Sequence, residues 1–154
     1  MRLQLAIEDN DIITHPEGDV ASLALNLMQN PIAILGPDEL MPAVNRFKNQ
    51  LNENSSRFAR IAAFPEMNHN ESVAWGGVGD DQDPSASDQA LLLLSWDGMH
   101  TRVRHRMDWF VSNCPTELAW KIHGDGETLL ECLLHLCIMT DWLSIALALL
   151  HGKD

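Results

Sequence analysis

The fold of this chain is indicated first by residues 90–96, Ala90-Leu91-Leu92-Leu93-Leu94-Ser95-Trp96, an apolar run that a turn sequence ends. Four consecutive leucines leave no polar face, which is typical of a strand buried on both sides of a parallel sheet. The run Ile32–Gly36 has the same character, and Ile61–Phe64 is a shorter example. The sequence therefore predicts several buried, parallel strands.

Segments with helical periodicity separate these strands. We expect helices at Val20–Met28, from Asp38 to about Leu51, at Thr101–Asn113 and from Glu127 to Leu150, and a fourth strand at Thr116–Ile122. Short apolar strands that alternate with helices pair in parallel through right-handed crossovers. We therefore predict an α/β fold, a three-layer αβα sandwich with a mostly parallel sheet, in a single domain.

Length and charge narrow the class of protein. The chain has 154 residues, 45% of them hydrophobic, which suits one domain with a proper core. Its 10 Lys and Arg against 22 Asp and Glu give a net charge of −12, which repels nucleic acids and anionic membranes. The run Trp142–Leu150 is too short to span a bilayer, and Met1–Asn10 does not resemble a signal peptide. We expect a soluble, cytoplasmic protein with neither a nucleic-acid nor a membrane partner.

Metal and cofactor sites are not indicated. The three cysteines, Cys114, Cys132 and Cys137, form no C-x-x-C pair, so we expect neither a zinc site nor disulfides, and no cofactor. The segment Gly76–Asp88, rich in glycine, serine and aspartate, is expected to be an exposed loop. In parallel sheets ligands bind at the carboxyl ends of the strands, here Leu35-Gly36, Phe64-Pro65 and Trp96-Asp97. A phosphate ligand there would need backbone N–H groups or a helix N-terminus to offset the acidity.

Two segments carry a specific resemblance. The stretch Arg46–Asn54, R-F-K-N-Q-L-N-E-N, is similar to the R-W-K-x-Q-x-N-E-N element of the bifunctional phosphoglucose/phosphomannose isomerases. The stretch Pro65–Trp75, P-E-M-N-H-N-E-S-V-A-W, resembles their P-E-x-N-H-N-E-x-V-G-W element, and Gly126–Asp154 resembles their last long helix with its L-x-G-x-D ending. The resemblance covers residues 20–154, with residues 1–19 as an N-terminal extension. It implies a sugar-isomerase (SIS) domain of the flavodoxin type.

The resemblance extends only to the second of the two SIS domains of that family. Their first domain carries a glycine- and serine-rich loop that holds the sugar phosphate, and no such loop occurs here. Their lysine near the C-terminus lies beyond the L-x-G-x-D element, so its role is not transferred to Lys153. The enzyme activity of the chain by itself is therefore left open.

The resemblance assigns two catalytic residues. Glu53 matches the base that moves a proton between C1 and C2 of the sugar through an enediol, and His69 matches the histidine that opens the ring. One helix end, one strand and one helix start separate them, a spacing that is compatible with both side chains meeting at one rim of the sheet. The alternatives are a solvated Glu53 near a helix end and a structural or helix-capping His69.

Six further residues of the two motifs are candidates for substrate binding. They are Arg46, Lys48, Asn52, Asn54, Asn68 and Asn70. A solvated helix face explains the two cations equally well. Glu66 and Glu71 are expected to cap or support the motif, while His135 and Met139 are expected to belong to the core.

Three functional hypotheses follow. The chain is a phosphosugar aldose–ketose isomerase domain that converts glucose 6-phosphate or mannose 6-phosphate to fructose 6-phosphate. Alternatively, it is a non-catalytic sugar-phosphate-binding or dimerisation module, or one subunit of a split enzyme whose phosphate-binding domain is a separate chain. Because the family's histidine can serve the neighbouring subunit's site, the resemblance also implies a homodimer.

Overall fold

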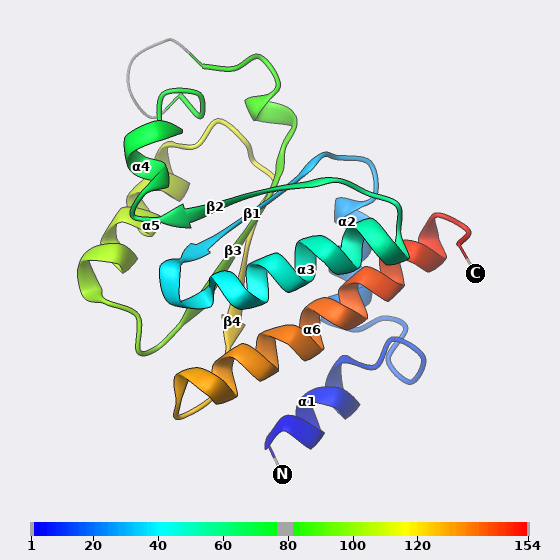
Figure 1. Cartoon of the computed structure of the whole chain (residues 1–154). Coiled ribbons are helices and arrows are strands. Elements are labelled where there is room, and N and C mark those ends of the chain that lie inside the picture. The colour runs from blue at the N-terminus through cyan, green and yellow to red at the C-terminus, as the bar shows by residue number, and fades with distance from the viewer. Residues whose placement is uncertain (1, 77–81, 154) are drawn as a thin grey trace.

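The computed structural model describes residues 2–76 and 82–153, which form one α/β domain (Figure 1). Its sheet consists of β1 (Ile32–Pro37), β2 (Ala59–Phe64), β3 (Ala90–Trp96) and β4 (Ala119–Gly124). The strands are all parallel and lie in the order β2-β1-β3-β4. The chain therefore reverses its direction across the sheet after β2, as in doubly wound folds.

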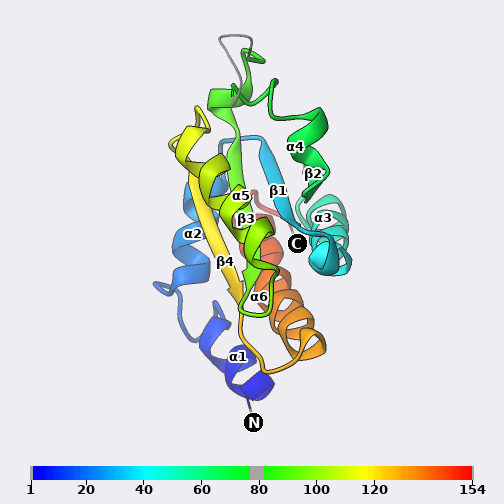
Figure 2. The same ribbon diagram turned by 90° about the vertical axis from the view of Figure 1, so that its left-hand side faces the viewer.

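Helices cover both faces of the sheet (Figure 2). They are α1 (Arg2–Asn10), α2 (Asp19–Leu27), α3 (Met41–Asn54), α4 (Met67–Asn70), α5 (Thr101–Asn113) and α6 (Leu129–Leu150), with short 3₁₀ turns at Asp38–Leu40 and Ala86–Asp88. One hydrophobic core lies between the sheet and α2, α3 and α6, and a second lies on the opposite face beneath α5. The predicted three-layer αβα sandwich is confirmed.

The predicted elements are present with small shifts at their ends. The fourth strand begins at Ala119 rather than Thr116, because the Thr116 hydroxyl turns the chain by donating to the Gln89 carbonyl (2.7 Å) and accepting from the Leu118 amide (3.1 Å). A 3₁₀ turn at Asp38–Leu40 precedes α3, where Pro42 occupies the first turn. Part of the expected loop Gly76–Asp88, residues 77–81, lies outside the described residues, and the part that follows it contains the Ala86–Asp88 turn.

The structure changes the interpretation of the first helix, α1, and of the last helix, α6. The first residues form α1, which packs along α6 and which periodicity did not predict. By length and composition the 22-residue α6 could cross a membrane, although its last nine residues alone could not. It contacts α1, α2, α3 and β4, and its buried side chains belong to the main core. We therefore interpret α6 as the central core helix of the domain.

Candidate functional site

Glu53 lies at the C-terminal end of α3, at the edge of the sheet where the strands begin. Its exposed side chain follows Leu51, which is fully buried and anchors this turn of the helix. The next residue, Asn54, donates to Oε1 of Gln50 (3.1 Å) and to the hydroxyl of Ser144 on α6 (2.8 Å). Glu53 is thus an exposed carboxylate on a backbone held in place by buried contacts.

The connection from α3 to β2 is fixed by Arg57, whose role sequence reasoning missed. Its guanidinium donates to the carbonyl oxygens of Leu27 (2.8 Å), Met28 (3.2 Å) and Asn30. Leu27 and Met28 lie at the end of α2, where helix carbonyls lack intrahelical partners, and the Leu27 carbonyl also accepts from the Asn30 amide (3.3 Å). Burial lowers the pKa of Arg57. The residue binds the segment after Glu53 to the end of α2, and an isolated arginine between Ser56 and Phe58 gave no signal of this.

His69 lies in α4, directly after the carboxyl end of β2. Its side chain is exposed, while Met67 and Trp75 on either side of it are 2% and 1% exposed and anchor the segment in the core under α5. The peptide bond between Phe64 and Pro65, which leads into α4, is cis. The histidine motif is therefore an exposed turn on a buried apolar base.

Other polar residues of this motif hold the segment together. Glu71 pairs with Arg60 of β2 (2.8 Å), whose guanidinium lies 5.7 Å from the ring centre of Trp75. Asn70 donates to Glu66 (3.4 Å), and Asn68 Oδ1 is buried with no hydrogen-bond partner among residues 2–76 and 82–153. The expected supporting role of Glu71 therefore has a structural basis.

The structure separates Glu53 from His69 within one chain. Glu53 precedes β2 and His69 follows it. The end of α3 and the helix α4, which carry them, lie at opposite ends of this strand (Figure 1). A strand of six residues spans about 20 Å. The expectation that both side chains meet at one rim is thus wrong for a single chain. The physical reason is that a strand carries the chain across the whole domain, so the residues before and after it cannot share an edge.

The candidate cations on α3 differ in their surroundings. Arg46 Nη2 lies 2.7 Å from Oδ2 of Asp141 on α6, and this hydrogen bond and the charge of Asp141 raise the pKa of Arg46. Lys48 is partly buried and forms no ion pair within the described part of the chain. The side chain of Asn52 is exposed. Arg46 thus joins two helices, whereas Lys48 has no ion pair among the described residues.

The carboxyl edge of the sheet, where such folds take their ligands, is acidic. A carboxylate follows the end of every strand within two residues: Asp38 and Glu39 after β1, Glu66 after β2, Asp97 after β3 and Asp125 after β4. Anionic groups at this edge oppose the binding of a phosphate. The local relief that a phosphate requires must come from helix N-termini or cations.

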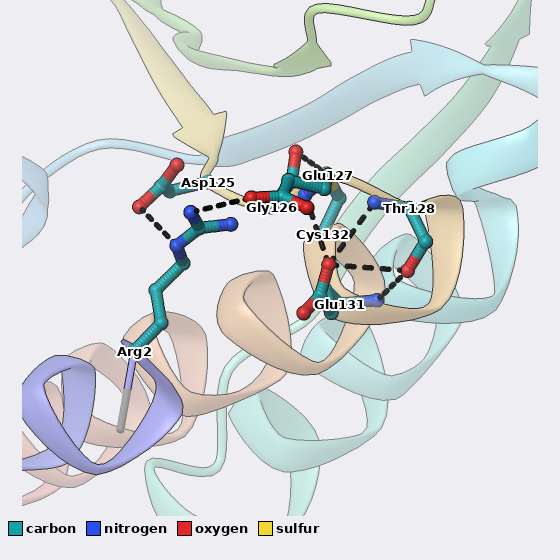
Figure 3. Close-up of polar contacts among 7 residues, drawn as sticks. All are labelled: Arg2, Asp125, Gly126, Glu127, Thr128, Glu131 and Cys132. Atoms are coloured by element: carbon teal, nitrogen blue, oxygen red, sulfur yellow. Dashed lines mark hydrogen bonds and ion pairs between the residues drawn. The ribbon is translucent and has the colours of Figure 1, made fainter.

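The N-terminus of α6 is already occupied by its own capping residues (Figure 3). Thr128 and Glu131 form a capping box, in which the Glu131 carboxylate accepts from the amides of Glu127 (2.9 Å) and Thr128 (3.1 Å). These backbone hydrogen bonds lower the pKa of Glu131. Arg2 of α1 lies 3.2 Å from Glu127 and 3.8 Å from Asp125. The sites that could accept a phosphate at this turn are therefore filled by side chains of the protein.

The chain matches one protein family over most of its length. Residues 17–154 match the family described as the bacterial phospho-glucose isomerase C-terminal SIS domain. The chain is also 33% identical over 114 residues to the bifunctional phosphoglucose/phosphomannose isomerase of Aquifex aeolicus (strain VF5). This aligned region covers 71% of this chain and 33% of that protein.

Solved structures show the same fold. A glucose-6-phosphate isomerase like protein from Thermus thermophilus superposes with a TM-score of 0.68 at 15% identity, covering 91% of this chain and 46% of that one. The C-terminal domain of glucosamine-fructose-6-phosphate aminotransferase from Francisella tularensis gives a TM-score of 0.72 at 9% identity, over 99% and 44% of the two chains. The chain thus spans less than half the length of these proteins. It belongs to the family of bacterial phosphoglucose isomerase C-terminal SIS domains.

Proposed function

We propose that this chain is the base-bearing domain of a phosphosugar aldose–ketose isomerase. It acts in the conversion of glucose 6-phosphate or mannose 6-phosphate to fructose 6-phosphate through an enediol, with Glu53 as base and His69 as ring opener. Its family and the name of its Aquifex relative support this reaction class. The three free cysteines accord with the cytoplasm as the proposed location.

The position of Glu53 supports its role as base. A base that serves both C1 and C2 has to reach the substrate from a fixed point. The bond from Asn54 to Ser144 holds the end of α3, and the Glu53 carboxylate has no ion pair among the described residues. It is therefore free to accept a proton from a sugar bound against this end of the domain.

The observation that carries the proposal is the placement of Glu53 and His69 at opposite ends of β2. With about 20 Å of strand between them, they can act on one sugar only if they come from two chains. We therefore propose a homodimer in which each site combines Glu53 of one chain with His69 of the other. Lys48, Asn52 and Asn54 belong to the Glu53 side of that site, and Asn68 and Asn70 to the His69 side. Arg46 is proposed to belong to the same side, with its guanidinium held by Asp141.

The phosphate of the substrate requires a further group. The carboxyl edge of this domain is acidic, and α6 caps its own N-terminus with Glu131. We propose that a second SIS domain, on the same polypeptide or on a separate subunit, holds the phosphate. The relatives' greater length supports this arrangement. The same acidic edge favours a second candidate, a non-catalytic domain that serves binding or dimerisation.

Exchange of the C2 proton of glucose 6-phosphate with deuterated water tests the proposal. We expect Glu53→Gln and His69→Asn each to abolish the exchange, and a mixture of the two variants to regain up to about a quarter of the wild-type rate, because only mixed dimers contain an intact site. The matched control Glu8→Gln, an exposed glutamate on α1, should leave the rate unchanged.

The outcomes separate the candidates. If the wild type exchanges the C2 proton but the mixture of Glu53→Gln and His69→Asn regains no activity, the proposed site shared by two chains is contradicted. Thermal stabilisation by glucose 6-phosphate without any exchange would support the binding module. If neither occurs for this chain, the same measurements after addition of a phosphate-binding SIS domain decide whether it is one part of a split enzyme.

A further inference from the structure

A cavity of about 260 Å³ opens between the carboxyl halves of β3 and β4 and helix α5. Its lining comes from both strands, from the β3–α5 turn and from α5. Glu53, by contrast, lies at the opposite edge of the sheet, where the strands begin. The cavity therefore lies apart from Glu53, and β1 separates its strands from β2, which leads to His69.

The floor of the cavity is apolar and rigid. Met99 and Met107 are 7% and 2% exposed, and Trp96 lies beside them. The indole N–H of Trp96 donates to Glu39 (3.1 Å), and the ring lies so close to Gly98 that an added Cβ would meet it at 2.3 Å. The Trp96 ring is thus fixed from two sides and forms a preformed wall.

Arg104 places a fixed positive charge at this cavity. Its Nη2 atom donates to the carbonyl oxygens of Asp97 (2.8 Å) and Trp96 (3.4 Å), which holds the guanidinium in one position. These partners are neutral, and no carboxylate in the described part of the chain pairs with Arg104. The remaining N–H groups of the guanidinium are available to an oxyanion, which arginine binds through two parallel hydrogen bonds.

Further donors lie around Arg104. Ser95 Oγ is 3.3 Å from Nδ1 of His123, whose Nε2 is 3.7 Å from Asp97. The ammonium of Lys121 is paired with Asp108 at 2.6 Å, so its charge is offset locally. The lining thus holds a hydroxyl, an imidazole and the Lys121–Asp108 ion pair beside the guanidinium of Arg104, with which no carboxylate among the described residues pairs. This set suits one negative charge and nearby hydroxyl groups.

We propose that this cavity binds a small oxyanion, a phosphate group that is either free or esterified to a short polyol. The charge of Arg104 selects the anion, and Ser95 and His123 hydrogen bond to its oxygens or to neighbouring hydroxyls. Because the volume is below the roughly 300 Å³ at which pockets for drug-sized ligands begin, the ligand has only a few heavy atoms beyond the anion itself. At this acidic edge Arg104 supplies the cation that a phosphate requires.

Titration followed by the ¹⁵N–¹H indole resonance of Trp96, identified by its loss in Trp96→Phe, tests the proposal. The probes are inorganic phosphate, glycerol 3-phosphate and glycerol, each at constant ionic strength. We expect a saturable shift with one or both phosphates and none with glycerol. If inorganic phosphate saturates the shift, the phosphate group alone is sufficient for binding. If glycerol 3-phosphate saturates it and inorganic phosphate does not, the ligand is a phosphate ester.

Variants of residues inside and outside the cavity test whether the shift of the Trp96 resonance arises from phosphate bound in the cavity. Arg104→Gln should weaken binding by about tenfold or more, as expected for the loss of a charged hydrogen-bond donor, while Arg106→Gln, an exposed arginine on the same helix, should not. Ser95→Ala should weaken it less and provides a second variant if Arg104→Gln does not fold.

Glu53→Gln should leave the titration unchanged, which separates this proposal from the isomerase site. A linear shift with every salt, or equal affinity in Arg104→Gln, Ser95→Ala and wild type, would overturn the assignment. The same conclusion would follow from the absence of any shift.

Discussion

Asn54 and Ser144, 90 residues apart, share a hydrogen bond of 2.8 Å that joins the end of α3 to α6. The Ser144 hydroxyl also donates to the Asp141 carbonyl (2.8 Å), and its side chain is fully buried. This contact lies one residue after Glu53. It links the proposed base to the central helix of the core.

The first prediction concerns this contact. Ser144→Ala leaves a polar atom of Asn54 without its buried partner, and we expect the free energy of unfolding to fall by about 1–3 kcal/mol. Ser112→Ala removes a comparable hydroxyl-to-carbonyl bond at an exposed position on α5 and should cost less. Urea denaturation of the two variants measures the difference, and equal losses would contradict the structural role of Ser144.

The second prediction concerns the turn after β3. Gly98→Ala places a Cβ at 2.3 Å from the Trp96 ring, which cannot move away without losing its bond to Glu39. We expect a loss of about 1–3 kcal/mol, as for an overpacked core. At Gly36 of β1 an added Cβ meets its neighbours at 3.4 Å or more, so Gly36→Ala should be better tolerated. Thermal unfolding measures both variants, and the reverse order would contradict the contact.

The third prediction concerns pH. Burial lowers the pKa of His135 on α6 below its ordinary value of about 6.5, and its Nδ1 atom has no partner among the described residues. The unfolded chain therefore takes up a proton near pH 6.5 that the folded chain does not. Stability contributed by neutral His135 is present above this pH and is lost as the pH falls below it.

Unfolding by urea between about pH 5 and 7 tests this effect. The variant His135→Leu should show a smaller decrease in stability at the acidic end than the wild type. The exposed residue His105 on α5 provides the control, since His105→Gln should retain the wild-type profile. Identical profiles for the wild type and His135→Leu would contradict the assignment.

The fourth prediction concerns Arg46 and Asp141. Their side chains are 47% and 34% exposed, so the ion pair should contribute only about 0.2–1 kcal/mol. A double-mutant cycle with Arg46→Gln and Asp141→Asn should give a coupling energy in this range that decreases in 1 M salt. A much larger, salt-independent coupling would indicate that Arg46 has a mainly structural role.

Much of the fold could be predicted because its strands are short, continuous apolar runs. Ala90–Trp96 has no polar face, and short apolar runs that alternate with helical segments along the chain pair in parallel. The helix α1 could not be predicted in this way, because Arg2, Gln4, Glu8 and Asp9 interrupt its apolar residues. Packing against α6 and the ion pairs of Arg2, both tertiary contacts, hold it in place.

The candidate site was predicted less completely. The motifs identified Glu53 and His69, and their assigned roles stay predictions. Their placement at one rim of the sheet was wrong for a single chain, because β2 crosses the sheet between them. The cavity near Arg104 had no signal in the sequence. Its polar side chains come from β3, α5 and β4, and Lys121 and His123 alternate with apolar residues as on any solvent-facing edge strand.

The helix α1 lies outside residues 17–154, the part that matches the family, yet it packs along the most apolar helix of the domain. For anyone who prepares this protein, the family boundary is therefore a poor place to cut. A fragment that starts at residue 17 loses Ala6, which is 5% exposed, and the pairing of Arg2 with Glu127. The uncovered side of α6 would then face water and favour aggregation during purification.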